Sequence, residues 1–198
     1  RVLYGSENGH SMEAWKAVRD NEFIFGQFLW TGIDYLGESH RWPSRGFASG
    51  LIDLAGNRKS RAFFRESLWS DKPMIYCGTF PKTATAGFPA IDAPPVWNYR
   101  EGDPVTVICY TNCERARLFL NGREAGAVKS RDDDRGYITW DVDWRPGKLE
   151  AAGYVAGGES ARHARETAGR PHAIKAVLLN NPIAAARGTA LVDIRIVD

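Results

Sequence analysis

One short apolar run constrains the fold of this chain more than any other feature. The run Phe23–Trp30 contains eight mostly apolar residues without polar alternation and ends in a tryptophan. A run this short and this apolar is typical of a strand that is buried on both faces, as in a parallel sheet. The polar residues that follow, as far as Glu38, then lie at the carboxyl end of the strand, where the active sites of α/β barrels are found.

A second strand of the same kind comes earlier in the chain. The segment Val2–Glu7 is an apolar strand with a carboxylate at its carboxyl-terminal tip. After it, Ser11 is a suitable N-cap for a short helix, and a second helix is expected after Asn57 and ends before Pro73. This alternation of strands and helices predicts parallel strands with crossover helices over residues 1–73.

The period of the sequence changes in the second half of the chain. Residues 74–95 contain four prolines and two glycines, which predict a linker or strap. Strands with alternating apolar residues follow, separated by turn signals such as Asn121-Gly122 and Arg145–Lys148. This pattern predicts an antiparallel immunoglobulin-like β-sandwich over residues 96–170 and the truncated start of a further sandwich domain over residues 171–198.

Several aromatic and sulfur-containing residues are expected to be structural. Trp140 and Trp144 share one face of a predicted strand with apolar neighbours, so we expect them in the core of the sandwich. Cys77, Cys109 and Cys113 follow no ligand spacing, so we expect free thiols that pack as small hydrophobic groups.

The composition excludes several classes of function. The net charge is +2, with 26 Lys and Arg against 24 Asp and Glu that are interspersed, so there is no electrostatic case for nucleic acid or an anionic membrane as a partner. No segment approaches the roughly 18 apolar residues that cross a bilayer. The sequence also contains no zinc spacing, phosphate-binding glycine loop or nucleophilic Ser or Cys motif, and we predict neither a metal nor a cofactor. Compartment and homo-oligomerisation stay open.

Several motifs together resemble glycoside hydrolase family 2, the β-galactosidase and β-glucuronidase family. The resemblance implies a fold class of α/β followed by all-β, with the last two strand–helix units of a (β/α)₈ TIM barrel and then an immunoglobulin-like β-sandwich. The most specific motif is Trp30–Tyr35. The segments that carry the resemblance are Gly5–Glu7, Gln27–Glu38, Trp42–Arg45, Gly50–Gly56, Thr111-Asn112, Leu118–Gly122 and Arg145–Gly147.

The resemblance assigns a catalytic role to Glu7. It corresponds to the family's nucleophile at the tip of the seventh barrel strand, in a retaining β-glycosidase that hydrolyses terminal β-galactoside-type linkages. The partner acid/base is the glutamate of an Asn-Glu pair on the fourth barrel strand, which this chain does not contain. The implied partners are therefore a carbohydrate substrate and the remainder of the catalytic barrel, and we expect the chain to be inactive alone.

Five further residues are candidates for substrate binding. The resemblance places Trp30 beneath the sugar, although a core aromatic that closes the barrel is the alternative. Asp34 and Glu38 follow that strand tip and either hydrogen-bond sugar hydroxyls or brace the loop, while Asn8 and His10 follow Glu7 directly.

One motif bears on specificity, and two alternative functions stay open. Asn57-Arg58-Lys59 resembles the Asn-x-Lys with which β-glucuronidases bind a uronate carboxylate. Here it comes after Gly50–Gly56, whereas in that branch it precedes the equivalent glycine, so we expect Lys59 to be structural. The alternatives are a family-2 enzyme of other specificity (β-glucuronidase or β-mannosidase) and a non-catalytic carbohydrate-binding or structural β-sandwich module.

Overall fold

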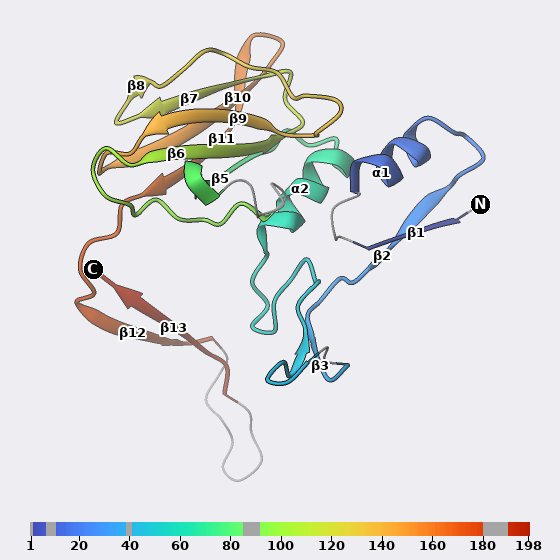
Figure 1. The fold of residues 1–198 in the computed structure, drawn as a ribbon, viewed down its shortest axis with the longest axis horizontal. Coiled ribbons are helices and arrows are strands. Elements are labelled where there is room, and N and C mark those ends of the chain that lie inside the picture. The colour runs from blue at the N-terminus through green and yellow to red at the C-terminus, as the bar shows by residue number, and fades with distance from the viewer. Residues whose placement is uncertain (1, 7–10, 39–40, 85–91, 180–189) are drawn as a thin grey trace. The chain divides into compact units, whose positions relative to one another are not determined.

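The computed structural model describes all residues except 1, 7–10, 39–40, 85–91 and 180–189 (Figure 1). It divides into two compact units, Arg1–Glu166 and Thr167–Asp198. Among the described residues, the regular secondary structure is mostly β-strand, with few helices. In chain order the elements are β1 (Val2–Ser6), α1 (Ser11–Arg19), β2 (Gly26–Trp30), β3 (Tyr35–Leu36), β4 (Gly46–Phe47), α2 (Ser60–Trp69), β5 (Ile75–Pro81), the 3₁₀ turn η1 (Lys82–Ala84), β6 (Pro104–Thr111), β7 (Arg115–Leu120), β8 (Arg123–Glu124), β9 (Ile138–Asp143), β10 (Lys148–Val155), β11 (Gly158–Glu166), β12 (Ala173–Leu178) and β13 (Val192–Val197).

The first unit begins with two parallel strands joined by a helix. β1 pairs with β2 in parallel register, from Val2 opposite Gly26 to Ser6 opposite Trp30. α1 connects them, and its apolar residues Met12 and Trp15 are buried. The predicted strand–helix–strand order is therefore present, and the carboxyl ends of both strands lie side by side.

The expectation that Phe23–Trp30 is buried on both faces is wrong for this chain. The strand itself begins only at Gly26, and the side chains of Phe25 and Trp30 are 78% and 57% exposed. The reason is that β1 and β2 form a sheet of two strands within the described residues. α1 contacts both strands, but a sheet of only two strands buries little of its surface.

Two antiparallel sheets make up most of the remainder of this unit. The strand orders are β5-β6-β9 in one sheet and β11-β10-β7-β8 in the other. The inward residues of both sheets form one apolar cluster, in which the predicted core residues Trp140 and Trp144 are confirmed. The buried members of the cluster are Ile75, Cys77, Trp97, Val105, Val107, Cys109, Ala116, Leu118, Ile138, Trp140, Trp144, Leu149 and Ala151.

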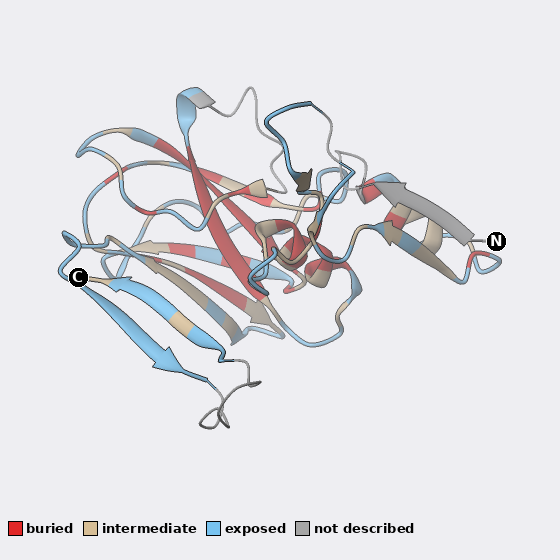
Figure 2. Ribbon diagram, turned by 90° about the horizontal axis from the view of Figure 1, so that it is seen from below, coloured by how far each residue is buried: buried red, intermediate tan, exposed pale blue. Residues whose placement is uncertain are grey.

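The helices cover the outer face of the three-stranded sheet. Phe64 and Leu68 of α2 and Trp15 of α1 share a second cluster with Tyr76 of β5 and Tyr110 of β6. The edge strand β5 and the central strand β6 are thus buried on both faces, as the burial colours in Figure 2 show. This packing fastens the β1–α1–β2 segment to the two sheets within one unit.

The structure differs from the sequence prediction at residues 75–81. We expected them in a linker, but they form β5, which pairs with β6 along its whole length. Of the four prolines that suggested a linker, the first is Pro81, the last residue of β5, so the apolar residues before it are free to form a buried strand. Gly78 allows the segment near Ala93 to pass close by, because a Cβ atom at this glycine would lie 2.3 Å from the Ala93 carbonyl oxygen.

Two predictions from the sequence, one on the Asn121-Gly122 turn and one on the cysteines, are confirmed. Asn121 and Gly122 both have positive φ, 51° and 76°, as a type I′ hairpin requires. Cys77, Cys109 and Cys113 are buried free thiols, as predicted.

The second unit is described by one β-hairpin. β12 and β13 pair antiparallel, so that Ile174 lies opposite Ile196 and Leu178 opposite Val192 on a single apolar face. The side chains of Ile174 and Ile196 are 74% and 72% exposed. The further sandwich domain expected over residues 171–198 stays a prediction. No helix in the described part of the chain is long and apolar enough to span a membrane.

Candidate functional site

The candidate site lies at the carboxyl ends of β1 and β2. Ser6, the last residue of β1, is the register partner of Trp30, the last residue of β2. In the sequence Glu7 follows Ser6 directly. Glu7, Asn8 and His10 lie outside the described residues, so their roles stay predictions.

Trp30 stands at the start of a ladder of aromatic rings. Its ring meets that of Tyr35 edge to face, with the centroids 6.3 Å apart. Tyr35 in turn stacks on Phe47 with a centroid separation of 5.7 Å. The ladder links the tip of β2 to the β3–β4 hairpin, and Trp30 stays more than half exposed and open to a ligand.

Glu38 is engaged locally rather than free. The Tyr35 hydroxyl donates a 2.5 Å hydrogen bond to the Glu38 carboxylate, and this carboxylate raises the pKa of Tyr35 above its ordinary value. Glu38 also adopts a positive φ of 43°. Of the two roles left open for Glu38, its contacts within the described chain match loop bracing.

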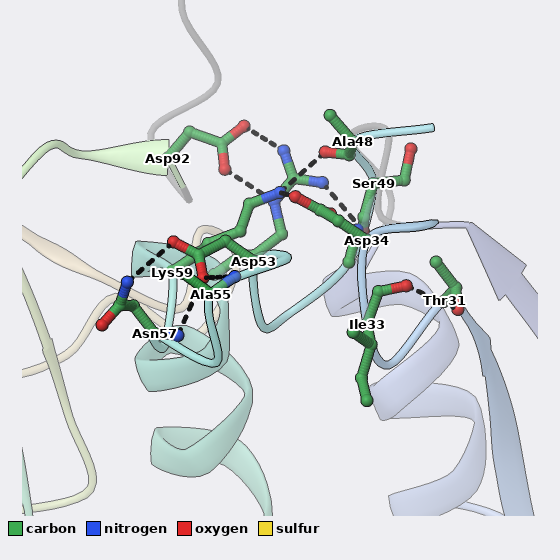
Figure 3. A network of polar contacts seen from close by, with 12 residues as sticks. Thr31, Ile33, Asp34, Ala48, Ser49, Asp53, Ala55, Asn57, Lys59 and Asp92 are labelled. Carbon is green, nitrogen blue, oxygen red and sulfur yellow. Dashed lines mark hydrogen bonds and ion pairs between the residues drawn. The ribbon is translucent and has the colours of Figure 1, made fainter. Parts of the chain in front are cut away.

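Asp34 lies at the centre of a polar network that holds the loop after β2 (Figure 3). Its carboxylate accepts hydrogen bonds from Lys59 Nζ at 2.9 and 3.1 Å and from the Gly50 amide at 2.7 Å. The Asp34 and Lys59 side chains are only 12% and 24% exposed. Gly50 must be glycine here, because a Cβ atom would lie 2.3 Å from the Asp34 amide nitrogen. These contacts also match a bracing role.

The Asn57–Lys59 segment is occupied by contacts within the chain. Lys59 Nζ donates to the Ala48 carbonyl oxygen at 2.7 Å in addition to its ion pair with Asp34. Asn57 donates from its backbone and its side chain to the Asp53 carboxylate, and these bonds lower the pKa of Asp53. The predicted structural role of Lys59 is consistent with this geometry.

A further ion pair at this edge was not anticipated from the sequence. Arg61, in the first turn of α2, forms a two-pronged pair with Asp92 at 2.7 and 2.5 Å and donates to the Ser49 carbonyl oxygen at 3.2 Å. The pair joins the loop, the helix and the segment that returns to the sheets. Because its partners are 31 residues apart in sequence, no local pattern could have indicated it.

The described residues contain no group of three or more His, Cys, Asp or Glu side chains that could hold a metal ion. The acidic run Asp132–Asp134 forms a turn in which Asp132 accepts hydrogen bonds from the Asp134 and Arg135 amides. These bonds lower the pKa of Asp132. The Asp132 carboxylate is therefore engaged in stabilising a turn.

Comparison with known proteins identifies the relatives of this chain. A sequence profile described as a domain of unknown function (DUF4982) matches residues 102–161. The β-galactosidase BoGH2A of Bacteroides ovatus is 35% identical over 166 residues, which are 82% of this chain and 18% of that protein. A crystal structure of a glycosyl hydrolase family 2 member from Bacteroides cellulosilyticus covers the whole chain and 27% of its own, with 31% identity and a TM-score of 0.82. The homologues of this chain are family-2 glycoside hydrolases.

Other family-2 relatives have a different name. A β-glucuronidase of Bacteroides fragilis is 27% identical over 138 residues, which are 66% of this chain and 17% of that protein. The chain thus spans less than a fifth of the length of both curated relatives. The family-2 match therefore establishes relationship, and both β-galactosidase and β-glucuronidase specificity occur among the relatives.

Proposed function

We propose that this chain is part of a retaining β-glycosidase of family 2. In this proposal β1, α1, β2 and α2 are the last two strand–helix units of the catalytic (β/α)₈ barrel. Glu7 is the nucleophile and Trp30 forms a wall of the sugar-binding subsite. The acid/base glutamate lies on a barrel strand outside this chain.

The register of β1 and β2 carries the proposal. Because Ser6 lies opposite Trp30, the strand tip that precedes Glu7 and the exposed tryptophan belong to the same edge of a parallel sheet. Active sites of α/β barrels lie at this edge. A retaining glycosidase needs a second carboxyl group about 5–5.5 Å from the nucleophile, and the remainder of the barrel would supply it.

The arrangement of the two antiparallel sheets supports an immunoglobulin-like domain after the barrel. The order β5-β6-β9 corresponds to strands A, B and E of that fold, and β11-β10-β7 corresponds to G, F and C. We propose that this domain buttresses the barrel through α1 and α2. Hydrolysis by two carboxyl groups requires no cofactor.

The proposed substrate is a terminal β-galactoside. Lys59, the lysine of the segment that resembles the uronate-binding motif, is here bound to Asp34 and to the Ala48 carbonyl oxygen. Breaking a partly buried ion pair to bind a substrate carboxylate would cost free energy. In the enzyme completed with the missing barrel strands, kcat/KM should be on the order of 100-fold higher for an aryl β-galactoside than for the matching β-glucuronide. The reverse preference would establish β-glucuronidase specificity.

A mechanism-based inactivator tests the role of Glu7. A 2-deoxy-2-fluoro-β-galactoside with a good leaving group should label the completed enzyme once, on the peptide that contains Glu7. Glu7→Gln should abolish both labelling and turnover, while the unsupplemented 198-residue chain should hydrolyse no chromogenic β-galactoside. A label on another carboxylate, or hydrolysis by this chain alone, would contradict the proposal.

The same variant distinguishes the alternative from another class. A non-catalytic sugar-binding module has no use for a carboxylate at this strand tip, so Glu7→Gln would leave its affinity for saccharides unchanged. Calorimetric titration of the completed protein with galactose and lactose, with and without the substitution, separates the two functions.

A further inference from the structure

The β3–β4 hairpin beyond Trp30 is braced from within. Its base is formed by the pairs Tyr35–Phe47 and Leu36–Gly46. The Gly37 amide donates to the Arg45 carbonyl oxygen at 3.0 Å, and Gly46 permits the close approach of the strands, because a Cβ atom there would lie 2.3 Å from the Tyr35 carbonyl oxygen. The base of the hairpin is therefore held by backbone contacts between residues 35–37 and 45–47.

Trp42 projects from the connection of this hairpin and is the most exposed large apolar side chain of the described residues. It is 85% exposed, whereas Trp15, Trp97, Trp140 and Trp144 are all buried. Among the described residues, Trp42 makes no ring contact with Trp30, Tyr35 or Phe47. An exposed tryptophan on a braced hairpin contributes little to the fold, and such residues are typical of ligand contacts.

The position of Trp42 in the chain keeps it near the candidate site. It precedes Gly46, at the base of the hairpin, by four residues, so the two Cα atoms are at most about 14 Å apart. The base is joined to Trp30 through Tyr35. Trp30 at the tip of β2 and Trp42 in the connection of the hairpin are thus two exposed aromatic residues on neighbouring segments of the chain.

We propose that Trp42 is a stacking platform for the leaving group of the substrate, in a subsite distinct from the one that Trp30 forms. The ligand class is a ring-bearing leaving group, such as the second sugar of a β-linked oligosaccharide, whose apolar face lies on the indole. In the sequence, Arg41 precedes Trp42 directly and Arg45 follows it by three residues. Within the described residues neither side chain makes an ion pair, so both have donors available for the hydroxyls of that ring. The inference rests on the proposed glycosidase function.

The chemistry of retaining hydrolysis allows the effect of this leaving-group subsite on the rate to be measured separately from that of the subsite at Trp30. The leaving group is present while the covalent intermediate forms and absent while water hydrolyses it. A residue that contacts only the leaving group therefore affects kcat/KM for substrates with a ring-bearing leaving group. It does not affect a substrate whose leaving group is fluoride, nor the rate at which the intermediate is hydrolysed.

The test compares two substrates of the completed enzyme that share the same sugar. With a β-galactosyl disaccharide, Trp42→Ala should lower kcat/KM about tenfold, the loss that corresponds to one aromatic contact. With β-galactosyl fluoride, kcat/KM should be unchanged, which also shows that the variant is folded. Trp42→Phe should retain most of the disaccharide activity, and Trp69→Ala, which removes an exposed tryptophan of α2, should change neither rate.

Each other outcome overturns the inference. Equal rates of Trp42→Ala and the unchanged enzyme on both substrates mean that the ring contacts no leaving group. An equal loss on both substrates, or loss of folding in both Trp42 variants, means that Trp42 is covered by another part of the protein. If the unchanged enzyme hydrolyses neither substrate, the proposed function fails and this inference fails with it.

Discussion

At the scale of single residues, the ion pair between Lys59 and Asp34 decides how well the loop after β2 is ordered. Both side chains are largely buried, and removal of one partner leaves an uncompensated charge. We expect Lys59→Met to destabilise the loop by about 1–3 kcal/mol. Hydrogen exchange of the Gly50 amide, which donates to Asp34, should become correspondingly faster.

The control for this prediction is an exposed lysine outside the network. Lys72→Met makes the same chemical change at an exposed position and should leave the exchange of the Gly50 amide unaltered. Equal exchange rates in Lys59→Met and the unchanged chain would show that the ion pair does not order the loop.

A single glycine controls the contact between the sheets and α1. Gly136 has a φ of 78°, and a Cβ atom there would lie 2.4 Å from Met12 Sδ and 3.0 Å from Phe64 Cε2. Gly157 has a similar φ of 82°, but a Cβ atom there would have no atom within 4 Å. A substitution at Gly157 therefore measures the free-energy cost of the positive φ alone. In urea unfolding, Gly157→Ala should lower the free energy of unfolding by about 1 kcal/mol. Gly136→Ala should lower it by about 1–3 kcal/mol more. Equal losses of stability in the two variants would mean that Met12 and Phe64 move aside from the added methyl group without a cost.

At the scale of elements, β5 and β11 meet through a buried histidine. Nδ1 of His163 in β11 accepts a hydrogen bond from the Cys77 amide at 3.2 Å, and its ring packs against Tyr76. Burial, aided by the positive charge of Arg165, lowers the pKa of His163 to about 4. The hydrogen bond between β5 and β11 therefore requires the neutral imidazole of His163.

This requirement predicts a pH dependence with a defined sign. Between the ordinary pKa of 6.5 and about 4, the unfolded chain binds a proton at His163 that the folded chain does not. The free energy of unfolding should thus fall as the pH decreases through this window and be fully restored above it. Urea unfolding at pH 7.5 and 5.0 measures the loss.

The matched variant for this experiment is His163→Asn. Its side-chain oxygen can accept the Cys77 amide in place of Nδ1 but does not titrate. The variant should lose less stability than the unchanged chain between the two pH values, and an identical pH dependence would assign the effect to other groups.

The elements that the sequence predicted and those that it missed differ in the kind of signal they carry. The helix near Ser11 and the Asn121-Gly122 turn were predicted from local patterns, and both occur, although Ser11 is the first residue of α1 and not its N-cap. β11 was missed because its residues are mostly polar, and it forms only by pairing along β10. The Lys59–Asp34 contact at the site was likewise invisible, because its two groups lie 25 residues apart.

At the scale of the whole molecule, the first unit combines a well-packed part with an incomplete one. The two antiparallel sheets share a contiguous core, and the helices bury the outer face of β5 and β6. The parallel pair β1–β2 has no further strand beside it within the described residues. Phe25, next to this pair, and Trp30, at the end of β2, are exposed and available for contact with another part of a protein.

This incompleteness predicts that the 198-residue chain self-associates. Exposed strand edges and apolar patches promote association between copies, and the side chain of Phe25 beside β2 is 78% exposed. Sedimentation equilibrium at micromolar concentrations should show oligomers, and Phe25→Asp should shift them towards the monomer. Leu54→Asp introduces the same charge at a residue that is 63% exposed but lies in a loop, and it should have no such effect. A monomeric unchanged chain would mean that the β1–β2 face needs no cover, which would remove the physical reason to expect further barrel strands against it.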